Sequence, residues 1–145
     1  MYQMADVFLT REQDQRRLVV SARDVRAAFE AALRAMLSVA DSDANSQAAS
    51  TRSVPFRGEG RDLARLFLDM LADLDAQLEI HGHDWVDVAV DGVLRNNDGG
   101  YVGWGYVYGT LAGEPGNALP ELREPPSVDV EASGAVVIRV RLLSR

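Results

Sequence analysis

The sequence predicts a single α+β domain over residues 1–145, with two amphipathic helices packed on a mixed or antiparallel β-sheet. Two segments carry apolar residues at every third or fourth position, which is the helical period. Several shorter segments are rich in β-branched and aromatic residues, as strands are. The chain is 47% apolar and 26% charged, the balance of one globular domain rather than of a disordered chain. The predicted order is β-β-α-β-α-β-β-β-β.

The first three elements form a predicted hairpin followed by a helix. Strands are expected at 3–10 and 16–20, joined by the polar stretch 11–15. Ser21 is a candidate N-cap, and a helix follows over 22–40. The apolar residues of this helix at helical spacing are Val25, Phe29, Ala32, Leu33, Met36 and Leu37.

A second strand–helix pair follows a polar loop at 41–50. The strand is expected at 51–57 and ends at the glycine-rich stretch 58–60. The helix runs over 61–79, with Gly82 placed to close it. Its apolar stripe comprises Leu63, Leu66, Phe67, Met70, Leu71, Leu74 and Leu78.

Both helices carry charged residues opposite their apolar stripes. Arg26, Glu30 and Arg34 follow one another four positions apart, so neighbours of opposite sign can pair along the first helix. The second helix carries acids on its polar side, and we expect solvated charge there rather than an acid–base pair. These acids are Asp62, Asp69 and Asp73.

The last third of the chain reads as four strands. A strong turn signal at 96–100 separates the first two, and Ser133-Gly134 separates the last two. A proline-containing loop is expected at 113–127. The strands are predicted at 84–91, 101–111, 128–131 and 135–143.

Composition excludes several classes of protein. The sequence has no cysteine, so it offers neither a disulfide framework nor a thiolate site. It has no long apolar run and no signal-peptide pattern, and we expect a cytoplasmic protein that does not enter membranes. The net charge is −7, which argues against strong direct binding of nucleic acid. A local basic patch at Arg11, Arg16 and Arg17 is a possibility that this charge leaves open.

Two groups of residues are candidate sites. His81, His83 and Asp84 could hold zinc or nickel, although a histidine at a helix end is also stabilised by the helix dipole without a metal. Trp104, Tyr106 and Tyr108 alternate with glycines and share one face of a strand. That face favours core packing, or else a surface that binds a small ligand, a peptide or a partner.

No catalytic motif is present. A G-x-S-x-G nucleophile turn is missing, and the glycine-rich stretch 99–105 precedes a strand rather than the helix that a phosphate-binding loop requires. The residues therefore predict a binding protein and not an enzyme.

Three stretches resemble the archease family. Gln3-Met4-Ala5-Asp6 keeps the last two residues of the family's His-Thr-Ala-Asp strand. Residues 24–37 and 61–71 look like its two helices, and the resemblance covers residues 2–112. The family's C-terminal motifs are missing, since the corresponding positions fall near 122–129 and 140–143, and the second of these has no acid.

The resemblance implies a function as well as a fold. Archeases are non-enzymatic partners of the GTP-dependent RNA-splicing ligase that seals tRNA exon halves and damaged RNA, and they promote its guanylylation and turnover. They bind a divalent cation such as Mg²⁺ or Ca²⁺ through carboxylates. By resemblance, Asp6 is a candidate metal ligand, and an RNA-splicing ligase is the expected partner.

Overall fold

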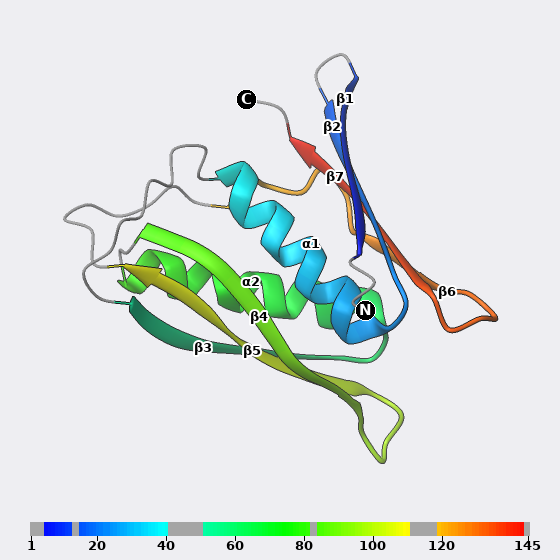
Figure 1. The fold of residues 1–145 in the computed structure, drawn as a ribbon. Coiled ribbons are helices and arrows are strands. Elements are labelled where there is room, and N and C mark those ends of the chain that lie inside the picture. Colours follow the sequence, from blue (N-terminus) through cyan, green and yellow to red (C-terminus); the bar gives the residue numbers. More distant parts are fainter. Residues whose placement is uncertain (1–4, 13–14, 41–50, 82–83, 111–118, 144–145) are drawn as a thin grey trace.

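The described residues form two helices and seven strands, whose arrangement is drawn in Figure 1. This computed structural model describes residues 5–12, 15–40, 51–81, 84–110 and 119–143. The predicted order of elements is confirmed. The elements are β1 (Asp6–Glu12), β2 (Gln15–Ala22), α1 (Val25–Ala40), β3 (Thr51–Gly60), α2 (Leu63–His81), β4 (Asp84–Arg95), β5 (Tyr101–Thr110), β6 (Ser127–Val130) and β7 (Val136–Leu143).

The strands form two antiparallel sheets, and the predicted single sheet is therefore divided. The larger sheet has the order β1-β2-β7-β6, and the smaller one has the order β3-β5-β4. Helix α1 contacts β2 and β7 of the first sheet and β4 of the second, while α2 covers β3 and β5. The first and last parts of the chain thus share one sheet, and the middle part forms the other.

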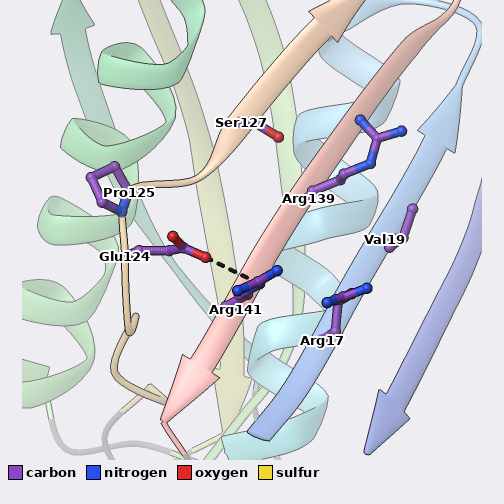
Figure 2. Close-up of a pocket in the computed structure, with 7 residues that line it drawn as sticks. All are labelled: Arg17, Val19, Glu124, Pro125, Ser127, Arg139 and Arg141. Carbon is purple, nitrogen blue, oxygen red and sulfur yellow. Dashed lines mark ion pairs between the residues drawn. The ribbon is translucent and has the colours of Figure 1, made fainter. Parts of the chain in front are cut away.

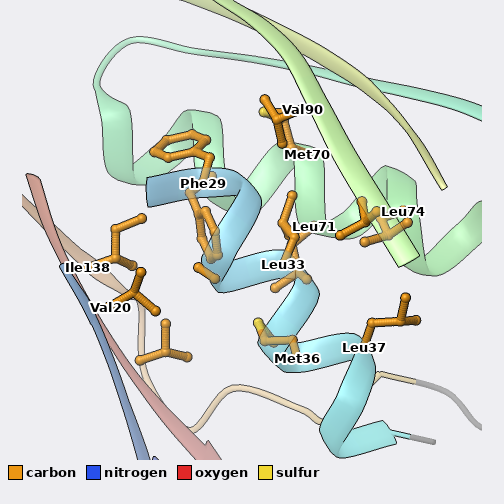
Figure 3. Packing of buried hydrophobic residues seen from close by; sticks show 14 of the residues in the cluster. Val20, Phe29, Leu33, Met36, Leu37, Met70, Leu71, Leu74, Val90 and Ile138 are labelled. Carbon is orange, nitrogen blue, oxygen red and sulfur yellow. The ribbon is translucent and has the colours of Figure 1, made fainter. Parts of the chain in front are cut away.

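One apolar cluster of buried residues joins the helices and both sheets (Figure 3). Phe29 of α1 meets Phe67 of α2 edge to face, with ring centroids 5.2 Å apart and an interplanar angle of 84°, an arrangement that aromatic rings favour. Both rings are fully buried. The other large side chains with the least exposure are Phe56, Leu18, Leu33, Met36, Leu66, Met70, Leu74, Ile138, Leu142 and Val20.

The two helix starts depend on aspartates. Asp24 Oδ1 accepts a hydrogen bond from the backbone N–H of Ala27 at 2.8 Å, and Asp62 Oδ1 accepts one from Arg65 at 2.8 Å. Both are N-caps. The prediction that Ser21 caps the first helix is wrong, because Ser21 lies in β2 opposite Asp6.

Several strands extend further than predicted. Most of the polar stretch 11–15 belongs to the β1–β2 ladder, where Arg11 faces Arg16. Likewise β3 continues to Gly60, since Gly58 to Gly60 pair with β5. The two predicted tight turns are confirmed. In these turns Gly99 and Gly134 have φ values of 93° and 91°, which favour glycine.

The charged face of α1 closes the open edge of β4. Glu30 Oε1 accepts a hydrogen bond from the Val90 N–H at 3.0 Å, and Arg26 donates to the Val90 carbonyl at 2.9 Å. Arg34 pairs with Asp87 at 2.6 Å. The predicted pairs of Glu30 with Arg26 and Arg34 also form, at 3.4 and 3.9 Å. These side chains occupy the backbone groups that an edge strand leaves free.

The acids of α2 do the same for the edge of β3. Asp73 Oδ2 accepts a hydrogen bond from the Arg57 N–H at 2.8 Å, and Asp69 Oδ2 accepts one from the Glu59 N–H at 2.7 Å. The interpretation of these aspartates as merely solvated charge is therefore wrong. The backbone N–H groups of β3 hold the carboxylates of Asp69 and Asp73 in place.

Candidate functional site

The aromatic stripe lies on the outer face of the smaller sheet. Trp104 and Tyr106 each expose 36% of their surface, and Tyr108 is half-buried. The interpretation of this stripe as part of the core is therefore wrong. The alternative interpretation, that the stripe is an exposed surface, agrees with these exposed fractions. Trp104 lies opposite Arg57 in the ladder, and its ring covers Gly92, where an added β-carbon would lie 2.6 Å from the ring atom Cη2.

The glycine face of the same sheet is the buried one. A β-carbon at Gly58 would lie 2.6 Å from the backbone nitrogen of Met70, and one at Gly103 would lie 2.5 Å from the Met70 sulfur. The close approach that the glycines permit is therefore made by α2 of the same chain and not by a partner. This leaves the aromatic side as the accessible one.

Asp6 stands at the start of the edge strand β1, with an exposed side chain opposite Ser21. The described residues contain no group of three or more His, Asp or Glu side chains that could hold a metal ion. Hard divalent cations take about six or more oxygen ligands, and one carboxylate does not supply them. The residues around Asp6 that the structure describes therefore do not fit the divalent cation implied by the resemblance.

The second metal candidate falls outside the described residues. His83 is one of the residues that the structure does not describe, and the same holds for the side chains of His81 and Asp84. The zinc or nickel site proposed for these three residues thus stays a prediction.

An arginine-lined pocket was not anticipated from the sequence (Figure 2). It lies on the outer face of the larger sheet, has a volume of about 310 Å³, and is lined by Arg17, Val19, Glu124, Pro125, Ser127, Arg139 and Arg141. The alternation of Arg139 and Arg141 with buried valine and leucine in the last strand was the available signal. It did not reveal that Arg17 of another strand lies beside them.

The predicted basic patch of Arg11, Arg16 and Arg17 does not share one face. Arg11 and Arg16 are opposite each other in the ladder, and Arg17, the next residue along β2, points to the other side. Arg16 donates a hydrogen bond to the carbonyl of Leu143 at 3.2 Å. Arg17 belongs instead with the arginines of β7.

Comparison with known proteins shows a likeness in fold. No protein-family model and no curated protein matches the chain. Among solved structures, the chain is similar to the solution structure of Methanobacterium thermoautotrophicum protein 1598, with a TM-score of 0.61 and 22% sequence identity. The match covers 94% of this chain and 97% of that chain. At this identity the likeness shows the fold alone, an archease-like arrangement of two helices on antiparallel sheets.

None of the helices in the described part of the chain is both long and apolar enough to span a membrane.

Proposed function

We propose that this protein is a non-enzymatic accessory factor that promotes the guanylylation and turnover of a GTP-dependent RNA-splicing ligase. The observation that carries the proposal is the archease-like fold, matched over 94% of the chain. The two helices of that fold contain the stretches that resemble the family in sequence. Ala5 and Asp6 add the preserved end of the family's first motif at the start of β1.

The charge of the protein supports docking on such a ligase. A net charge of −7 is complementary to the basic groove of an enzyme that holds RNA, and opposite potentials accelerate encounter. The proposal includes no step through a bound metal ion, because the described surroundings of Asp6 do not fit one.

The accessible aromatic face is the proposed contact surface. Exposed aromatic side chains are enriched where proteins bind one another, and Trp104 and Tyr106 are both exposed on the outer side of β5. Trp104 and Tyr106 share one face of β5, and we expect this face to meet a protein partner.

The test is a guanylylation assay with the RNA-splicing ligase of the same host. We expect the ligase to react with labelled GTP faster when the protein is present, and we expect Tyr106→Asp to lose at least half of that acceleration. Phe8→Asp is the matched control, because Phe8 is an aromatic residue with 61% exposure on the other sheet. Absence of both co-purification and acceleration, over a range of salt concentrations, would remove the proposal.

The same exposure favours a second candidate, a module that binds a small ligand or a peptide through Trp104, Tyr106 and Tyr108. Trp104 would report such binding directly, since indole fluorescence changes when a ligand covers the ring. A screen of peptides and small molecules should then yield a ligand whose signal is lost in Trp104→Phe, with Trp85 as the remaining reporter. Acceleration of the ligase without any such ligand would decide against this candidate.

A further inference from the structure

The arginine pocket is formed where the chain leaves and rejoins the edge of β7. Arg123 donates its backbone N–H to the Arg141 carbonyl at 2.8 Å, and Ser127 at the start of β6 pairs with Arg139. The connection between these two points turns away from the strand. Figure 2 shows Glu124 and Pro125 of this connection forming one wall, with the three arginines projecting from β2 and β7.

Two of the three arginines are held by acids. Arg141 Nε lies 3.1 Å from Glu124 Oε1, and Arg139 Nη1 lies 3.0 Å from Asp129 Oδ2. Each guanidinium has five N–H donors, so each keeps donors that these single contacts do not use. The ion pairs fix where the two cations stand at the pocket.

Arg17 has no comparable partner in the described part of the chain. Among the residues that the structure describes, no ion pair or hydrogen bond is made by its guanidinium. Arg17 and Arg141 are moreover directly opposite each other in the antiparallel β2–β7 ladder and point to the same face. Like charges in this position destabilise a sheet. Glu124 offsets the charge of Arg141, and an anion beside Arg17 would offset the repulsion that remains.

We propose that this pocket binds the phosphate group of a small phosphate monoester, with Arg17 and Arg141 as its main ligands. This inference is independent of the proposed function, because it concerns the other sheet. Guanidinium groups match the oxygens of phosphate with paired hydrogen bonds. Three arginines line the pocket, and Glu124 and Asp129 pair with two of them, so the charge of Arg17 is left over and favours an anionic ligand.

The size and remaining lining also fit a small ester. A volume of about 310 Å³ is at the lower end of the range for small-molecule sites. Ser127 offers a hydroxyl to a phosphate oxygen, while Val19 and Pro125 provide apolar walls for the organic part of the ester. A nucleoside 5′-monophosphate is the probe that combines these features.

The experiment measures thermal unfolding and binding of adenosine 5′-monophosphate at constant ionic strength, with adenosine as the uncharged comparison. We expect the monophosphate to raise the melting temperature and adenosine to leave it unchanged. Arg17→Gln should bind about tenfold more weakly, because a charge-assisted contact is lost. Without ligand, Arg17→Gln should be at least as stable as the natural protein, because it removes the repulsion with Arg141.

Arg57→Gln is the matched control, since Arg57 is a well-exposed arginine on the other sheet that pairs with Glu59 at 3.0 Å. It should bind the monophosphate as the natural protein does. An equal response in Arg17→Gln, or no response in the natural protein, would overturn the proposal. Binding of a 5′-phosphorylated RNA oligonucleotide without binding of the mononucleotide would overturn the assignment to a small ligand.

Discussion

Phe29→Ala is expected to lower the free energy of unfolding by about 3–5 kcal/mol, the usual cost of deleting a buried aromatic side chain. Phe29 is fully buried and contacts Phe67 edge to face at 5.2 Å. Because α1 touches both sheets, the resulting cavity would lie where the two sheets share their only cluster of buried residues in the described part of the chain. Urea unfolding followed by circular dichroism would measure the loss.

Phe8→Ala is the control for this prediction. Phe8 is the same residue type on the edge strand β1, but it is 61% exposed. Its removal should change the free energy of unfolding by no more than about 0.5 kcal/mol, as is usual for surface substitutions. Similar losses for the two variants would mean that the hydrophobic cluster is not organised around the helix–helix contact.

Gly58→Val is expected to have the second largest effect, a loss of about 3 kcal/mol from overpacking. A β-carbon at Gly58 would stand 2.6 Å from the backbone nitrogen of Met70 and 2.7 Å from its Cγ. Rotation of the Met70 side chain can relieve the second clash but not the first, so α2 itself must move away from β3. That movement would also strain the hydrogen bonds by which Asp69 and Asp73 hold the strand.

Ser53→Val tests the same strand on its opposite face. Ser53 is exposed, and a β-branched residue is well suited to a strand. We expect this variant to be as stable as the natural protein or slightly more stable in the same urea titration. If Gly58→Val were as stable as the natural protein, the result would contradict the close packing of α2 against Gly58.

The hydrophobic pattern by itself determined the fold class and the elements. Phe29 and Phe67 belong to stripes with helical spacing, and both are buried as the stripes predict. The turn residues near Gly99 and Gly134 marked two hairpins correctly. These inferences succeed because helical and strand periods are properties of the local backbone, so a short segment reveals which of its side chains face the interior.

The sequence also yielded an archease-like fold from partial motifs, and the structural likeness agrees with it. The residues that make up a functional site are harder to predict from the sequence than the fold is. The motif identifies Asp6 as a candidate ligand, yet nothing in the sequence shows whether other carboxylates lie around it. A ligand set depends on residues from separate strands, and their register cannot be read from either strand alone.

Only the tertiary structure decided how the strands are divided and which polar groups meet. Glu30 and Asp69 looked like surface charges, but each accepts a hydrogen bond from the backbone of an edge strand. Arg17 and Arg141 come from opposite ends of the chain and become direct neighbours through the pairing of β2 with β7. Burial is encoded locally by side-chain spacing, whereas contacts between residues distant in sequence depend on how the whole chain folds. The pocket beside these arginines therefore forms only when β2 and β7 have paired.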